Sequence, residues 1–254
     1  MGLFHLLILL LTQPIFAQTS TDTAPWTLYQ KYKNDYYYQY NNYQTSLSQF
    51  EQKKQIDSKY KSITTSKEKN EAFIKSYIAR NNALDTYCRT LRVKLSINQQ
   101  YNPQNTKIIQ GILAQKENLL QQENQKVQDI DITDNSKLQD THKQFEDKLD
   151  DIKKNINTAL VEDNINYNLS LIDHALKLSD EISKDPQNDD NTNHILKAIS
   201  LKLEDYRQES ISKTTYNPEA GKPTKNPSSS LNDLDAINQQ ILDAISNLKS
   251  IIQN

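Results

Sequence analysis

Along most of the chain beyond Trp26, large apolar side chains recur three or four residues apart, which is the spacing of one face of an α-helix. No run alternates apolar and polar residues for long enough to predict a half-buried strand. The 254 residues include only three glycines, too few for Gly-rich phosphate loops or a set of tight β-hairpins, which need glycine's freedom at positive φ. The sequence therefore predicts an all-α fold, an elongated bundle of long amphipathic antiparallel helices.

Two tyrosine-rich stripes predict the first pair of helices. Thr65 and Glu68 have the spacing of a capping box, which places the start of the second helix at Thr65. A polar connection of about ten residues makes the two helices antiparallel neighbours. The stripes are Tyr29, Tyr32, Tyr36, Tyr40, Tyr43, Leu47 and Phe50 in the first helix and Phe73, Tyr77, Arg80, Leu84, Tyr87, Leu91 and Leu95 in the second.

The middle of the chain continues the helical pattern. Asn102 and Pro103 supply a cap and a first-turn proline for a third helix. Residues 136–184 predict either one bent helix or two helices, because the apolar pattern changes phase near Val161–Asn164. A further amphipathic helix begins near Ile195.

The last helix has the most regular apolar stripe in the second half of the chain. Ser230 and Asp233 have the spacing of a cap at its start. A helix with so wide an apolar face is marginal alone in water, so we expect it either to fold back on the bundle or to pair with another chain. Its stripe is Leu234, Ile237, Ile241, Ala244, Leu248 and Ile251.

The first residues carry a targeting pattern. Residues 3–17 are mostly apolar, with Pro14 and a small residue at Ala17, as in a secretory signal; the alternative is a buried N-terminal helix. We therefore expect an exported protein that is extracellular, at the cell surface or periplasmic. The predicted segments are a signal peptide (1–17), an extended N-terminal segment (18–25), a basic helical hairpin plus third helix (26–130), an acidic helical region (131–215), a Pro/Ser-rich linker (216–230) and a C-terminal amphipathic helix (231–254).

Recognisable catalytic and metal-binding motifs are missing from the sequence. The three histidines beyond the signal are isolated, and Cys88 is the only cysteine and is expected to be a half-buried packing residue. The acidic run Glu146–Asp151 has lysines at helical spacing, as on a solvated helix face. We expect no enzymatic activity, no catalytic residues, no metal, no cofactor and no small-molecule substrate.

Two groups of residues are candidates for binding. Tyr37 and Tyr38 lie off the first stripe, where aromatic side chains can contact a partner. Residues 53–94 carry a net charge of +7, which can attract an anionic polymer or a membrane surface. The alternative partner for this basic region is the chain's own second half, whose net charge is -9. The candidate lysines are Lys53, Lys54, Lys59, Lys61, Lys67 and Lys69.

One stretch also carries a family resemblance. After the Trp- and Tyr-rich first helix come the runs Thr64–Lys69, Ile78–Tyr87 and Leu91–Leu95. Over roughly residues 26–98 the chain resembles the uncharacterised exported helical (coiled-coil-like) proteins of small-genome candidate-phyla bacteria. The resemblance implies an exported helical protein and implies no activity.

The functional expectation follows from these observations. We expect an exported non-enzymatic structural or interaction protein that acts through helix–helix contacts at the cell surface. Its partner would be another protein or a second copy, bound through an amphipathic helix. The alternative is a protein that binds an anionic polymer or membrane surface through the basic region 53–94.

Overall fold

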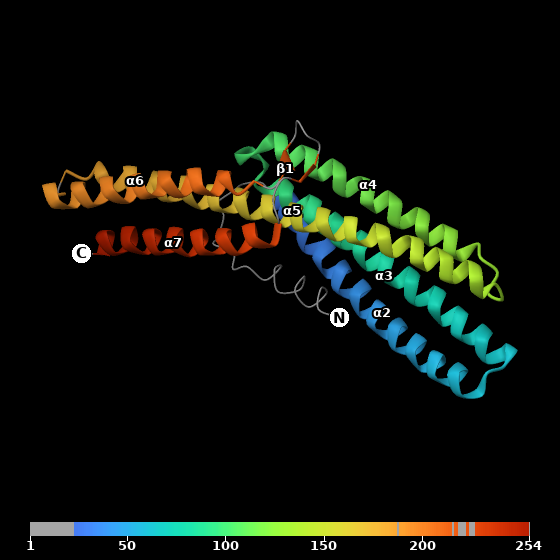
Figure 1. The fold of residues 1–254 in the computed structure, drawn as a ribbon. Helices are drawn as coiled ribbons and strands as arrows, with labels where there is room; N and C mark the ends of the chain where they lie inside the picture. Colours follow the sequence, from blue (N-terminus) through green and yellow to red (C-terminus); the bar gives the residue numbers. More distant parts are fainter. Residues whose placement is uncertain (1–22, 187, 215, 218–221, 224–226, 254) are drawn as a thin grey trace.

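The computed structural model describes residues 23–186, 188–214, 216–217, 222–223 and 227–253. The predicted signal peptide lies outside these residues. Within them the all-α prediction is confirmed, as is the elongated bundle of antiparallel helices (Figure 1). The elements are α2 (Thr23–Tyr60), α3 (Ile63–Ile97), the 3₁₀ turn η2 (Gln99–Tyr101), α4 (Pro103–Gln128), α5 (Asn135–Ser183), α6 (Asp190–Ser212), β1 (Tyr216–Asn217), β2 (Lys222–Pro223) and α7 (Pro227–Gln253).

Helix α5 is the common element of two groups of helices (Figure 1). Near its start it pairs with α4, where Lys116 Nζ lies 2.6 Å from Asp151 Oδ2. Near its end it pairs with α6, where Arg207 donates to Asp173. The first group consists of α2, α3 and α4, and the second consists of α6 and α7; α5 belongs to both. The molecule is elongated because the two groups follow one another along this 49-residue helix.

Residues 135–183 form one continuous helix, so the break considered near Val161–Asn164 does not occur. Every residue from Thr158 to Asn166 is buried, which is more than two full turns. At this point α5 is covered on all sides, because the first group of helices ends here and the second begins. The apolar stripe changes phase because the helix changes neighbours.

The turn between α2 and α3 is much shorter than the predicted ten residues. Only Lys61 and Ser62 connect the two helices. The cap is Ser62 and not Thr65: Ser62 Oγ accepts from Thr65 N at 3.1 Å, and Thr65 Oγ1 accepts from Ser62 N at 3.0 Å. Glu68, the predicted capping partner, is ion-paired with Lys53 at 2.7 Å instead. The earlier cap prevails because it lets both helices form additional backbone hydrogen bonds.

The predicted extended segment 18–25 is helical at its end. Residues Thr23, Ala24 and Pro25 belong to the first turn of α2, while 18–22 lie outside the described residues. Proline is accepted in a first turn because the N–H that it lacks would have no partner within the helix. The helix therefore begins before Trp26, where the apolar stripe first becomes visible.

The predicted linker 216–230 also contains structure. Strands β1 and β2 pair antiparallel, with Tyr216 opposite Pro223. Helix α7 begins at Pro227, one turn before the predicted start. A proline at the first helical position has its φ already close to the helical value, which explains the earlier start.

The predicted apolar stripes of α2 and α3 supply most of the core between these helices, while Tyr32, Leu47 and Phe50 are only half-buried. Tyr29, Tyr36 and Tyr40 of α2 are buried, and the Tyr36 ring lies 4.9 Å from that of Tyr87 on α3. Cys88 is fully buried and not half-buried as predicted; burial raises the pKa of its thiol above the ordinary value. Its small apolar side chain therefore acts as a packing residue of α3.

Helix α7 folds back on its own chain. Leu234, Ile237, Ile241 and Leu248 are buried, and the helix packs against α5 and α6. This is one of the two arrangements that the sequence left open. The apolar face that makes an isolated helix marginal is covered from within the chain, and a short connection favours such docking through a high effective concentration.

Shortening a buried side chain at the centre of α5 should destabilise the whole fold. Ile165 is fully buried where α5 is surrounded, so Ile165→Ala should lower the free energy of unfolding by about 2–5 kcal/mol. The matched control is Leu201→Ala on α6, whose side chain is 62% exposed and should change stability by less than about 0.5 kcal/mol. Chemical denaturation measures both; similar losses for the two variants would contradict this packing.

Candidate functional site

The predicted binding residues lie in two separate places. Tyr37 and Tyr38 are in the first half of α2, whereas the candidate lysines are at its end and in the first turns of α3. Tyr38 and Lys59 are about 30 Å apart along the helix at 1.5 Å per residue. The structure therefore does not bring the aromatic and basic candidates together.

The two tyrosines differ in exposure. Tyr37 packs partly against the core, its ring 5.8 Å from that of Tyr36, and burial raises the pKa of its hydroxyl above the ordinary value. Lys33 Nζ lies 6.0 Å from the Tyr37 ring. Tyr38 is 65% exposed. Of the pair, Tyr38 is the side chain available to a partner.

Much of the basic region 53–94 is neutralised within the chain. Arg80 pairs with Glu146 on α5 at 2.8 Å, and Lys94 pairs with Asp163 on the same helix at 2.5 Å. The chain's own acidic second half is thus the partner of these two basic residues, as the alternative interpretation expected. The acidic run of α5 is correspondingly a paired surface and includes the contact between Asp150 and Lys153 at 3.0 Å.

The end of the α2–α3 hairpin is different. We call residues 56–67 the tip. Lys59, Lys61 and Lys67 are exposed, and no ion pair within 4.0 Å joins them to any other described residue. The neighbouring candidates are paired: Lys53 with Glu68, Lys54 with Glu51 and Lys69 with Asp57.

The tip also exposes apolar side chains that the sequence analysis did not single out. Ile56 is 40% exposed, Tyr60 67% and Ile63 80%. These are three of the eight exposed large hydrophobic side chains among the described residues. The sequence does contain a sign of this exposure: all three residues come after Phe50, where the apolar stripe of the first helix stops.

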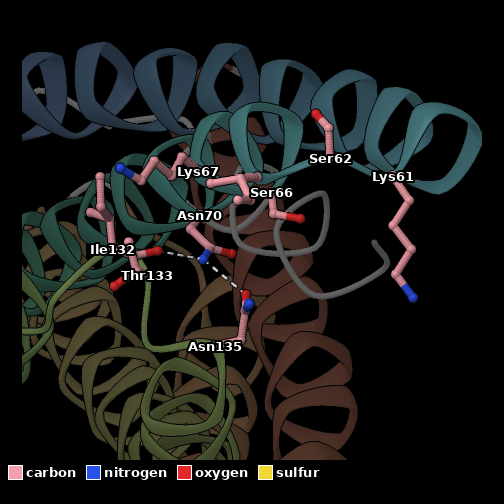
Figure 2. Close-up of a pocket in the computed structure, with 9 residues that line it drawn as sticks. Lys61, Ser62, Ser66, Lys67, Asn70, Ile132, Thr133 and Asn135 are labelled. Atoms are coloured by element: carbon pink, nitrogen blue, oxygen red, sulfur yellow. Dashed lines mark hydrogen bonds between the residues drawn. The ribbon is translucent and has the colours of Figure 1, made fainter.

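A groove of about 510 Å³ lies beside the tip (Figure 2). Asn70 Nδ2 donates to the carbonyl oxygen of Ile132 at 2.6 Å and to Asn135 Oδ1 at 2.9 Å, which ties α3 to the α4–α5 loop. In Figure 2 Lys61 and Lys67 stand on opposite sides of this amide. The lining residues are Lys61, Ser62, Ile63, Ser66, Lys67, Asn70, Ile132, Thr133 and Asn135.

The start of α3 already holds a carboxylate. Asp57 accepts from Thr65 Oγ1 at 2.9 Å, Ser66 Oγ at 2.8 Å and Lys69 Nζ at 3.0 Å. These hydrogen bonds, that from Lys69 first, lower the pKa of Asp57 to about 2. Because Asp57 occupies this position, the positive end of the helix is not an open site for an external anion.

A second candidate is a polar cluster at the covered centre of α5. Glu162 is 2% exposed, and burial raises its pKa to about 7, although hydrogen bonds with Asn102 and Thr106 act in the opposite direction. Asn166 Nδ2 donates to Thr106 Oγ1 at 3.0 Å. A carboxyl with a raised pKa is a typical catalytic acid or base, but one this deeply buried is not accessible to a substrate, so we assign the cluster a structural role.

The same cluster reaches the second group of helices. Asn168 Nδ2 donates to the carbonyl oxygen of Leu234 at 3.2 Å, and Asn238 Nδ2 donates to Asn168 Oδ1 at 2.8 Å. These bonds join α5 to α7, while Asn166 and Glu162 join α5 to the start of α4. Polar side chains here therefore orient the two groups of helices relative to one another.

The described residues show neither a metal site nor a membrane-spanning helix. They contain no group of three or more His, Cys, Asp or Glu side chains arranged to hold a metal ion. Among their helices, none combines the length and apolar character needed to cross a bilayer. The tip is the described surface where exposed large apolar side chains lie beside lysines that have no ion pair with any other described residue.

Comparisons with known proteins return no family model, no curated protein and no solved structure that matches the chain. The proposed function therefore rests on the chain's own sequence and structure.

The buried Glu162 should make stability depend on pH. Its pKa of about 7 in the folded protein lies above the ordinary value, so the folded state holds the extra proton between about pH 4.5 and 7. The contribution of Glu162 to the free energy of unfolding should fall by roughly 3 kcal/mol over that range as pH rises, and then level off.

The variant Glu162→Gln isolates this effect, because the amide has the shape of the protonated carboxyl and does not titrate. Denaturation curves from pH 4 to 8 should show the difference between variant and parent growing in favour of the variant as pH rises. The exposed Asp147→Asn on the same helix is the control. A constant difference across the range for Glu162→Gln would refute the assignment.

Proposed function

We propose that the protein is an exported, non-enzymatic interaction protein whose contact surface is the tip of the α2–α3 hairpin. The observation that supports this most is the combination of Ile63 and Tyr60, both largely exposed, with the exposed lysines 59, 61 and 67. Uncovered apolar side chains beside unpaired charges are typical of interaction sites. Export rests on the apolar pattern of residues 3–17.

The tip is better supported than the C-terminal helix as the contact surface. The apolar stripe of α7 lies against α5 and α6, with Ile241 and Leu248 fully buried. A partner that used this stripe would first have to displace it from the core. Binding at the tip requires no such rearrangement, because its apolar side chains are already exposed.

The shape of the molecule suits presentation of the tip. The α2–α3 turn lies at one end, whereas the α5–α6 turn and the end of α7 lie at the other (Figure 1). Helix α5 alone, with 49 residues, is about 70 Å long at 1.5 Å per residue. In this proposal the helices around α5 hold the tip at a distance from the opposite end of the molecule. The protein acts by binding a partner at the tip.

Site-specific photo-crosslinking tests the proposal. A photoreactive residue is placed at Ile63 or, as a control, at Leu201, which is similarly exposed on α6. In cells that produce the protein, position 63 should give a specific cross-linked product in much higher yield than position 201. Equal yields at the two positions, or no product at 63, would refute a contact surface at the tip.

A further inference from the structure

We infer that the tip binds the surface of an anionic lipid bilayer. In this arrangement Ile56, Tyr60 and Ile63 enter the boundary between headgroups and acyl chains, and Lys59, Lys61 and Lys67 contact lipid phosphates. The inference rests on the proposed function, since it names the partner of the same tip. No described helix crosses the bilayer in this arrangement, and the protein is held at its surface.

The apolar part of the tip is suited to shallow insertion. Ile56 and Tyr60 are four residues apart and therefore lie on one face of α2, and Ile63 opens α3 after the two-residue turn. Ile63 is the most exposed of the three, at 80%. Transfer of these side chains from water to the interface is favourable, and tyrosine in particular suits the headgroup level because it has an apolar ring and a polar hydroxyl.

The charges of the tip favour an anionic surface. Lys59, Lys61 and Lys67 are exposed and have no ion pair with any other described residue. The carboxylates next to them are engaged: Asp57 is bound by Thr65, Ser66 and Lys69, and Glu68 by Lys53. Free lysines beside apolar side chains are the pattern by which peripheral proteins bind anionic lipids.

The α4–α5 loop sets the orientation of the bound protein. Asp131 and Asp134 are next in sequence to the groove-lining residues Ile132, Thr133 and Asn135, so an anionic surface at the groove would repel them. Each carboxylate is engaged by backbone N–H groups of its own neighbourhood: Asp131 accepts from Thr133 N at 2.8 Å, and Asp134 caps α5 by accepting from Lys137 N at 2.9 Å. Hydrogen bonds from Thr133, and in addition the charge of Lys67, lower the pKa of Asp131. Lys67 therefore contacts the bilayer at the edge of the bound surface, and Lys59 and Lys61 contact it most closely.

The small size of the tip favours a bilayer over a folded protein. Stable protein interfaces cover roughly 800 Å² on each partner, which is far more than three apolar side chains at the end of a hairpin supply. A bilayer rearranges around a protruding end and needs no matching surface. The lysines then add long-range attraction that salt weakens.

Vesicle co-sedimentation tests the inference. The chain beginning at Gln18 contains every described residue and lacks the apolar residues 3–17, which would bind lipid by themselves. It should sediment with vesicles that contain phosphatidylglycerol and not with pure phosphatidylcholine. Increasing salt should weaken the binding.

Variants of the tip locate the contact. Both Tyr60→Ser with Ile63→Ser and the triple change K59Q, K61Q and K67Q should reduce partitioning by at least about tenfold. The controls on α6 are Leu201→Ser and the pair K197Q and K202Q, which alter exposed side chains of the same kinds and should have little effect. Circular dichroism and thermal melting check that every variant is folded.

The outcomes separate this inference from the proposed function. Absence of binding to anionic vesicles, or binding that the tip variants do not weaken more than the α6 controls, overturns the lipid assignment. If the protein does not bind anionic vesicles but position 63 still cross-links specifically to a protein, the tip remains the contact surface and only the lipid assignment is wrong. If both experiments fail, the proposed function falls as well.

Discussion

The covered centre of α5 is the constraint on which the rest of the structure depends. From Thr158 to Asn166 every side chain is buried, and several of them are polar. A buried polar group that lacks a partner destabilises a protein by more than its hydrogen bond contributes, so neighbouring helices must present partners at the right places. Lys94 and Thr106 supply them from the first group of helices, and Leu234 and Asn238 supply them to Asn168 from α7.

This arrangement accounts for the difference between the centre and the tip. At the centre, α5 has neighbours on every side, and fully buried residues such as Ile165 hold both groups together. Helix α2 packs chiefly on α3, so its apolar side chains have fewer neighbours toward Tyr60. Local stability follows the density of buried contacts. The protein thus combines a tightly packed middle with an end whose apolar side chains remain available for binding.

The sequence predicted the faces of the helices well because helical periodicity is a local property. The stripe of α7 is buried as predicted, and Pro103 begins α4 as predicted. Helix starts were predicted less well where two start signals compete, as Ser62 does with Thr65 and Pro227 with Ser230. Both true starts lie before the predicted ones, because a longer helix gains backbone hydrogen bonds that a motif search does not weigh.

By itself, the sequence determined that this chain forms long helices, which face of each helix is apolar, and where positive charge gathers. Only the tertiary structure decided which helix covers each face, because a 3.6-residue period shows that a face must be buried and not what buries it. For that reason the segment Val161–Asn164 resembled a bend or break in the sequence and is fully buried in the fold. The ion pairs of the lysines also depended on the tertiary structure. Packing brought Lys94 to Asp163, whereas Lys59 and Lys61 have no ion pair with any other described residue at the tip.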